Sequence, residues 1–334
     1  MELKNFNLKK KVFIIAEVGN NHEGNFTIAK KLVHQAAKAG VDAVKFQTFK
    51  TENFIRKKDK KRFQKLKKFE LSYNQFQFLK KLAHKRKIKF ISTPLDLESA
   101  DFLNKNADLI KIASGDNNFY PLIDKVLKSE KPIIISTGMT NALQIKNLTN
   151  YIVKAIGKKA TEKRISLLHC VTSYPVEDRF ANLRSVEYLI KNSKLTIGYS
   201  DHTLGNEACI AAVTMGAKVI EKHFTINKKF SKFRDHALSA DYLDMRNLVL
   251  GIRKVEMQLG ELNKEIQKPE KKLIKIVRRA AYADKHILPG EKLGLKNIKF
   301  LRPALTSNFN ILKKIIGKKI KKTFYKGQKI NLNT

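Results

Sequence analysis

The chain has 334 residues, of which 43% are hydrophobic, so it can bury a sizeable core and still carry a small second domain. Its 68 lysines and arginines outnumber its 30 acidic residues and give a formal net charge of +38. No apolar run approaches the roughly 18 residues that a membrane-spanning helix needs, and residues 1–11 lack the features of a signal peptide. We therefore expect a globular, cytoplasmic protein with reduced thiols at Cys170 and Cys209, its only cysteines.

The positive charge raises the question of nucleic-acid binding. However, the lysines are spread over almost every segment, no zinc-finger or RNA-binding motif occurs, and the chain has no tryptophan to stack on bases. A general use of lysine at solvated positions explains the charge better than a basic patch does. Nucleic-acid binding stays as an alternative, and in either case the charge should attract anionic substrates.

Short β-rich runs alternate with amphipathic stretches up to about residue 258. The predicted strands are residues 12–18, 41–47, 88–92, 109–112, 132–136, 165–169, 195–199 and 217–222. Helical spacing of apolar residues is clear at 28–39, 73–84, 141–156 and 206–215. Eight such units favour a (βα)8 TIM barrel over a doubly wound sheet.

Three other segments do not fit this repeat. Residues 51–72 are very rich in lysine and arginine, and we expect a long insertion after the second strand, which reads most simply as a solvated loop. After a catalytic barrel at residues 1–260, residues 261–276 have the charged character of a linker. Residues 277–334 show short strands and turns, and a β-rich domain this small is more plausible as an accessory lid than as an enzyme.

The ends of the predicted strands carry the candidate functional residues, because these ends meet at the catalytic face of a barrel. His202 and His223 follow consecutive strands and are expected to bind one divalent metal ion. The other strand ends are also polar: Glu17, Lys45, Gln47, Thr93, Lys111, Ser114, Asp116, Ser136, Thr172, Tyr174 and Ser200. Ion pairs and helix caps explain any one of these residues, but lysines and hydroxyls at so many strand ends suit a phosphate and a carboxylate.

These residues belong to six motifs that resemble the sialic acid synthases, which condense phosphoenolpyruvate with acylamino sugars to form N-acetylneuraminate and related nonulosonates. The motifs are, in chain order, IIAEVGNNHEG (14–24), VKFQT (44–48), FISTP (90–94), ISTGM (135–139), GYSDHT (198–203) and EKHFT (221–225). Residues 277–334 resemble the antifreeze-like (SAF) domain of that family, including Arg302 before Pro303. The resemblance therefore covers nearly the whole chain.

The resemblance implies a role for each candidate residue. Phosphoenolpyruvate would be bound by Lys45, Thr93, Lys111, Ser114, Ser136, Thr172 and Ser200. His202 and His223 would bind Mn²⁺, with Mg²⁺ or Co²⁺ as alternatives, and the sugar would contact Glu17, Tyr174, Asp235 and Arg302. Asp116 stands where many members have Glu, so a shorter carboxylate would act as the base. The lid with Arg302 would close the site of the partner subunit in a domain-swapped homodimer.

The sequence leaves two questions open. Another phosphoenolpyruvate-dependent 2-keto-3-deoxy acid synthase, of the deoxy-octulosonate or heptulosonate type, is an alternative activity, although the appended lid argues against it. The acceptor is also undetermined: N-acetylmannosamine, its 6-phosphate, and the diamino sugars that lead to legionaminate or pseudaminate all fit the motifs.

Overall fold

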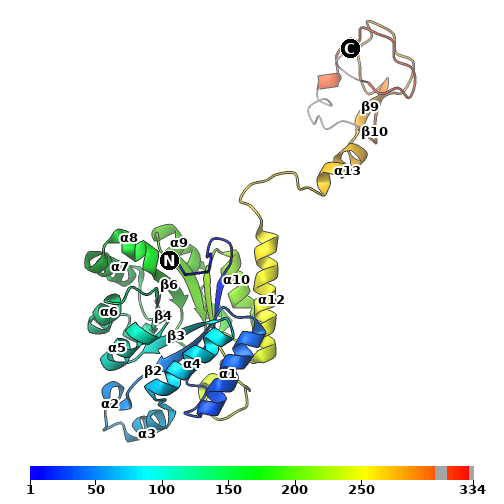
Figure 1. Ribbon diagram of the computed structural model, residues 1–334. Coiled ribbons are helices and arrows are strands. Elements are labelled where there is room, and N and C mark those ends of the chain that lie inside the picture. Colours follow the sequence, from blue (N-terminus) through cyan, green and yellow to red (C-terminus); the bar gives the residue numbers. More distant parts are fainter. Residues whose placement is uncertain (305–313, 331–334) are drawn as a thin grey trace. The chain divides into compact units, whose positions relative to one another are not determined.

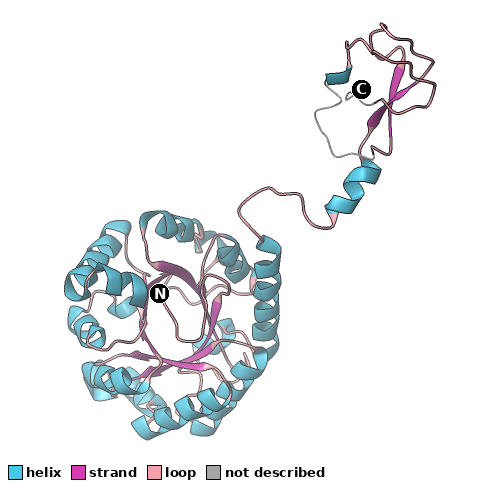
Figure 2. Ribbon diagram, turned by 45° about the horizontal axis from the view of Figure 1, so that its top comes forward, coloured by secondary structure: helices cyan, strands magenta, loops and turns pink. Residues whose placement is uncertain are grey.

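The computed structural model describes residues 1–304 and 314–330, and the chain divides into two compact units, Met1–Gly260 and Glu261–Thr334. In the first unit eight parallel strands pair in chain order, and β1 also pairs with β8, so the sheet closes into a barrel surrounded by helices (Figures 1 and 2). This arrangement confirms the predicted (βα)8 TIM barrel.

The eight strands begin and end within two residues of the predicted bounds. They are β1 Phe13–Gly19, β2 Ala43–Thr48, β3 Lys89–Pro94, β4 Leu109–Ile112, β5 Ile133–Ser136, β6 Ile165–Cys170, β7 Thr196–Asp201 and β8 Val219–His223. The helices that follow them are α1 Phe26–Ala39, α4 Tyr73–Lys85, α5 Leu97–Asn106, α6 Tyr120–Leu127, α7 Ala142–Ile156, α8 Lys158–Arg164, α9 Arg184–Asn192, α10 Glu207–Thr214, α11 Arg234–Leu238 and α12 Tyr242–Leu259.

Strand alternation divides the barrel into two apolar regions and places the polar site above one of them. Outward-facing residues such as Ile14 and Val44 pack against the helices. Inward-facing residues such as Phe13, Ile15 and Ile91 fill the lower part of the barrel interior. Because successive side chains point to opposite faces of a strand, the inward position after Ile15 is Glu17. The inside of the barrel is therefore apolar at the amino ends of the strands and charged at their carboxyl ends.

The lysine-rich segment at residues 51–72 forms two short helices, α2 Thr51–Phe54 and α3 Lys60–Phe69, where we expected a solvated loop. One of its buried residues, Phe69, lies 5.3 Å from Phe233, measured between ring centroids. Gly24, with φ of +80°, lies so close to α3 that an added Cβ would sit 1.9 Å from the Lys68 carbonyl oxygen. A few apolar residues among many lysines thus anchor the segment to the barrel.

The second unit has its own small core. Strands β9 Ala280–Ala283 and β10 Ile298–Leu301 pair antiparallel, and Ile287, Leu293 and Phe324 are among the residues that pack around them. Helix α13, Glu270–Val277, occupies half of the segment that we expected to be a linker. Residues 305–313 and 331–334 of the predicted SAF domain lie outside the described residues, and the SAF assignment itself stays a prediction.

Two further observations concern the chain as a whole. Among the described residues no helix is both long and apolar enough to cross a membrane. Cys170 and Cys209 are buried, free thiols, as expected.

Candidate active site

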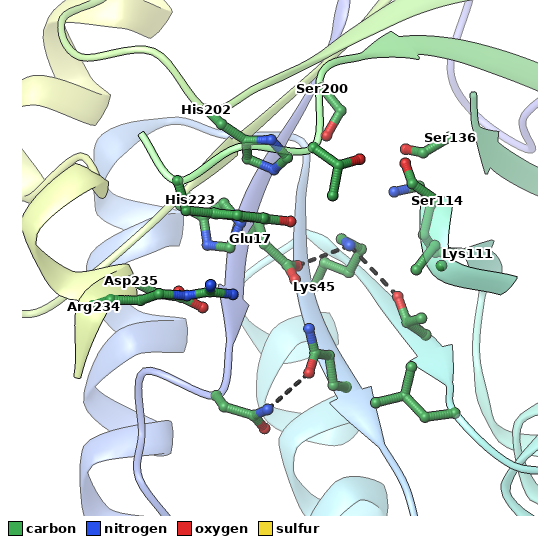
Figure 3. Close-up of a pocket in the computed structure, with 18 of the residues that line it drawn as sticks. Glu17, Lys45, Lys111, Ser114, Ser136, Ser200, His202, His223, Arg234 and Asp235 are labelled. Atoms are coloured by element: carbon green, nitrogen blue, oxygen red, sulfur yellow. Dashed lines mark hydrogen bonds and ion pairs between the residues drawn. The ribbon is translucent and has the colours of Figure 1, made fainter. Parts of the chain in front are cut away.

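A cavity of about 850 Å³ opens at the carboxyl ends of the barrel strands. It brings together every candidate residue of the first unit: Glu17, Lys45, Gln47, Thr93, Lys111, Ser114, Asp116, Ser136, Thr172, Tyr174, Ser200, His202, His223 and Asp235. The remaining candidate, Arg302, is exposed in the second unit. In Figure 3 the histidines lie beside Glu17 on one side of the cavity, and Lys111, Ser114 and Ser136 lie on the opposite side.

Four charged side chains, which we call the charged floor, are buried together in this cavity: Glu17, Lys45, Lys111 and Glu221. The Lys45 ammonium lies 3.1 Å from Glu17 Oε2 and 3.3 Å from Glu221 Oε2. The Lys111 ammonium lies 2.9 Å from Glu221 Oε1. None of the four is more than 4% exposed, so each cation depends on these carboxylates for compensation.

The two carboxyl groups of the floor differ in proton affinity. Burial raises the pKa of Glu17 to about 7, although Lys45 acts in the opposite direction. Burial also acts to raise the pKa of Glu221, but Lys111 and Lys45 outweigh it and hold that pKa below its usual value. Near neutral pH, Glu17 is therefore the floor carboxyl that exchanges a proton, while Glu221 stays ionised.

Hydroxyl groups from several strands surround the floor. Ser200 donates to Glu221 Oε1 over 2.9 Å, and Lys45 donates to Thr93 Oγ1 over 3.5 Å. Ser136 Oγ is buried and has no hydrogen-bond partner among the described residues, which leaves it available to a ligand. This part of the cavity therefore presents ammonium and hydroxyl donors to an anion.

Gly138 is required for the close approach of two of these hydroxyls. Its amide N–H donates to Ser114 Oγ over 3.1 Å. A Cβ at this position would lie 2.3 Å from Thr172 Oγ1 and 2.6 Å from Ser114 Oγ. Any larger residue would thus push Ser114 and Thr172 out of place.

His202 and His223 lie next to each other, with 5.3 Å between their ring centroids. His202 Nδ1 lies 2.8 Å from the Val171 carbonyl, so Nδ1 carries the proton and Nε2 is free to bind a metal ion. His223 Nδ1 is buried without a hydrogen-bond partner, and burial, reinforced by His202, holds the His223 pKa well below its usual value. Burial acts to lower the pKa of His202, but its contacts with Cys170 and the Val171 carbonyl outweigh burial and raise that pKa. Two imidazoles this close suit a divalent ion once both are deprotonated.

The rest of the metal's coordination is not supplied by a ready-made cluster. Among residues 1–304 and 314–330 no group of three or more His, Cys, Asp or Glu side chains is arranged to hold a metal ion. Cys170 Sγ lies 3.9 Å from His202 Nδ1, the nitrogen that faces the Val171 carbonyl. The described residues thus fit an ion bound by two imidazoles, with positions left for water or substrate.

Tyr174 and Asp235 lie on the histidine side of the cavity. The ring centroids of Tyr174 and His202 lie 4.2 Å apart. Burial raises the pKa of the Tyr174 hydroxyl. Arg234 also lies on this side of the cavity. Its guanidinium is 4.6 Å from the Tyr174 ring centre and 3.1 Å from Asp235 Oδ1. Asp116 lines the cavity in the short turn after β4, where burial raises its pKa.

Sequence reasoning did not assign a role to several residues that line the cavity. Glu221 is the most important, and a signal existed for it: it lies two residues before His223 in a strand and must face the same side. The other group consists of exposed cations that we call the rim cations: Arg62, Lys65, Lys232 and Arg234. They come from α3, from the segment before α11 and from the first residue of α11, and no strand pattern marks them.

Comparison with known proteins identifies relatives along most of the chain. The family model described as "NeuB family" matches residues 32–264. The N,N'-diacetyllegionaminic acid synthase of Campylobacter jejuni is 41% identical, with 88% of this chain and 91% of that protein covered. The pseudaminic acid synthase of the same strain is 31% identical, with 96% of each chain covered.

Solved structures agree with this assignment. The crystal structure of N-acetylneuraminic acid synthetase from Leptospira borgpetersenii in complex with citrate superposes with a TM-score of 0.76 at 32% identity. The superposed region covers 82% of this chain and 94% of the Leptospira chain. Since the family model matches well over half of the 334 residues, and each of the six barrel motifs contributes at least one residue to the cavity, this chain belongs to the NeuB family of nonulosonic acid synthases.

Proposed function

We propose that this chain condenses phosphoenolpyruvate with a diacetamido hexose to form a nine-carbon 2-keto-3-deoxy acid of the legionaminate type and inorganic phosphate. The charged floor carries the first half of the proposal, because two buried ammonium groups among hydroxyls suit a small, multiply charged anion. The choice of acceptor rests on the comparisons: identity is 41% to the legionaminic acid synthase and 31% to the pseudaminic acid synthase of the same Campylobacter strain.

The floor would bind phosphoenolpyruvate by exchanging partners. Lys45 and Lys111 contact Glu17 and Glu221 in the free protein. When Glu17 takes up a proton, two cations face a single carboxylate, and the floor acquires a net positive charge. We infer that the carboxylate and phosphate of the substrate then take over the ammonium groups, while Thr93, Ser114, Ser136, Thr172 and Ser200 supply hydroxyl hydrogen bonds.

The acceptor sugar would lie between the charged floor and the two histidines, in contact with Tyr174 and Asp235. Carbon 3 of phosphoenolpyruvate attacks the open-chain aldehyde carbon, and a carbon–carbon bond forms. Glu17, which is partly protonated near pH 7, supplies the proton that the aldehyde oxygen takes up.

Positive charge then develops at carbon 2, and water adds there. Asp116 accepts the proton of this water, because burial raises its pKa above that of an ordinary carboxyl. The bond between carbon 2 and the phosphate oxygen then breaks, the carbon 2 hydroxyl passes its proton to the departing phosphate and becomes the keto group, and Lys45 and Lys111 stabilise the leaving anion.

His202 and His223 would hold a divalent ion, for which we propose Mn²⁺, with Mg²⁺ or Co²⁺ as substitutes. Such an ion supplies Lewis acidity toward the aldehyde oxygen. The residues contribute by their fixed geometry: the hydrogen bond from His202 Nδ1 to Val171 directs Nε2 away from that carbonyl, and the buried His223 stays neutral.

Arg302 stands apart from these residues, since it belongs to the second unit. We propose, from the family resemblance, that it contacts the acyl group of a sugar bound to another copy of the chain in a homodimer. Its guanidinium is exposed and can donate to a carbonyl oxygen.

The acceptor assignment is tested with purified protein, phosphoenolpyruvate, Mn²⁺ and a panel of sugars: N-acetylmannosamine, its 6-phosphate, and the 2,4-diacetamido hexoses that lead to legionaminate and pseudaminate. Mass spectrometry should find one nine-carbon keto acid, formed fastest from the legionaminate precursor, with one phosphate released per product. Lys111→Met protein serves as the inactive control. If N-acetylmannosamine were turned over faster than the legionaminate precursor, the assignment of the acceptor would be wrong. If no sugar gave a product, the proposed activity would be wrong.

A further inference from the structure

A second buried ion pair lies behind the two histidines, outside the cavity. Asp201 of β7 and Lys222 of β8 are register partners, and Lys222 Nζ lies 2.5 Å from Asp201 Oδ2. The two side chains are 0% and 3% exposed, and neither lines the cavity. Charges are costly to remove from water, so this pair needs a reason beyond the binding of substrate.

Both oxygens of the Asp201 carboxylate accept hydrogen bonds. Its Oδ1 accepts hydrogen bonds from Tyr199 Oη at 3.0 Å and from both the amide and the hydroxyl of Thr203 at 2.8 Å. Its Oδ2 accepts from Lys222 and from Cys209 Sγ at 3.3 Å. Lys222 also donates to the Thr203 carbonyl over 2.8 Å. The chain on both sides of residue 202 is therefore held at fixed points.

Each member of the pair is the sequence neighbour of a histidine. Asp201 immediately precedes His202, and Lys222 immediately precedes His223. Along β8, successive side chains point to opposite faces, so Lys222 faces out of the barrel where His223 faces in. The ion pair thus joins the two strand ends that carry the imidazoles.

We propose that the Asp201–Lys222 ion pair is a positioning device, which fixes His202 and His223 at the spacing and orientation that one divalent ion needs. This inference rests on the metal site of the proposed function and adds two positioning residues to it. A charge-assisted hydrogen bond is shorter and stronger than a neutral one, which suits the task of holding two strand ends at a fixed distance.

A neutral contact in the same barrel supports this interpretation. Between β2 and β3 the buried side chains of Thr48 and Ser92 meet at 2.7 Å. Neither of them lines the cavity, and no histidine follows either strand end. Two hydroxyls suffice where adjacent strands need only to be joined, whereas a charged pair is used beside the histidines.

The test replaces both members of the pair, because changing one would leave the other charge buried without a partner. In Asp201→Asn/Lys222→Met the asparagine keeps an oxygen acceptor for Tyr199 and Thr203, and the ionic link between strands is lost. Ser92→Ala, which removes one of the two hydroxyls between β2 and β3, is the matched control.

Two measurements are made on the full chain: titration with Co²⁺, followed by its visible absorption, and side-chain ¹⁵N spectra of His202 and His223 in metal-free protein. We expect the double variant to bind Co²⁺ about 10- to 100-fold more weakly, as other changes behind metal ligands do. The histidine nitrogen resonances should shift or broaden. Its affinity for phosphoenolpyruvate should fall clearly less than its affinity for Co²⁺, because Lys45 and Lys111 lie on other strands, although Ser200 and Glu221 are sequence neighbours of the changed residues. Ser92→Ala should match the wild type in both measurements.

The outcomes separate this inference from the proposed function. If wild-type protein binds Co²⁺ but the double variant binds it equally well with unchanged histidine spectra, the positioning role is wrong and the metal site stands. If wild-type protein binds no Co²⁺, the metal site is wrong, and the nitrogen spectra alone decide whether the pair positions the imidazoles. An equal loss of Co²⁺ and phosphoenolpyruvate binding would mean a general structural role and would overturn the inference.

Discussion

The charged floor and the rim cations belong to one cavity, yet they use positive charge in different ways. Lys45 and Lys111 on the floor are at most 4% exposed and pair with buried carboxylates. At the rim, Lys65 and Lys232 are exposed, and the Arg234 side chain is 68% exposed. Buried charges interact strongly at fixed distances, whereas exposed charges act weakly and over a longer range. The floor can therefore stabilise a reaction, and the rim can only attract its substrate.

The sharpest test of this difference removes one lysine from each region. We expect Lys111→Met to lower kcat/KM for phosphoenolpyruvate by about 10³-fold, because it removes a preorganised donor from the leaving phosphate. Lys65→Met at the rim should cost less than about tenfold. Phosphate release measures both, and urea unfolding checks that each variant is folded. Equal losses from the two substitutions would show that burial does not distinguish the regions.

The floor should also make stability depend on pH through Glu17. Its pKa is raised to about 7 in the folded protein from 4.5, so the folded state binds more protons than the unfolded state between these pH values. The contribution of this group to stability is then complete below about pH 4.5 and is lost as pH rises through 7.

Glu17→Gln should remove that dependence. Relative to wild type, we expect the metal-free variant to gain about 1 to 3 kcal/mol in the free energy of unfolding between pH 5 and pH 8. Urea unfolding at a series of pH values measures the difference. Thr172→Ala, which changes an uncharged side chain of the cavity, is the control and should follow the wild-type slope. A constant difference between Glu17→Gln and wild type would mean that Glu17 titrates normally.

The charged floor and the rim cations also differ in how well the sequence predicts them. The floor lysines and hydroxyls are predictable because β-strand alternation and barrel geometry fix where the residue at a strand end must point. Glu221 obeys that rule too, since it lies two residues before His223 in β8 and faces the same side. Pairing of these lysines with Glu17 was one explanation that the sequence offered, and Glu17 and Lys45 are register partners on β1 and β2. The contacts of both lysines with Glu221 were not predicted, since they reach across the barrel from β2 and β4 to β8.

The rim lies outside that rule. Arg62 and Lys65 are indistinguishable in sequence from the other lysines and arginines of residues 51–72, and composition favoured a solvated loop there. Packing of Phe69 against Phe233 and the close approach of Gly24 to Lys68 bring α3 to the cavity. Tertiary contacts between two loops thus decide which of many cations line the site, and no local pattern records them.

The smallest effect that we predict comes from the rim, and it should appear only at low salt. Lys65→Ala/Lys232→Ala removes two exposed charges that line the cavity. At about 50 mM salt we expect kcat/KM for phosphoenolpyruvate to fall about 3- to 10-fold, because long-range attraction of the anion weakens. At about 500 mM salt, where such charges are screened, variant and wild type should converge.

Lys158→Ala/Lys159→Ala on α8 makes the same change of charge at exposed positions away from this cavity, and it should leave the salt dependence unaltered. If the rim variant instead loses the same factor at every salt concentration, Lys65 and Lys232 contact the substrate directly, and the division between floor and rim no longer holds.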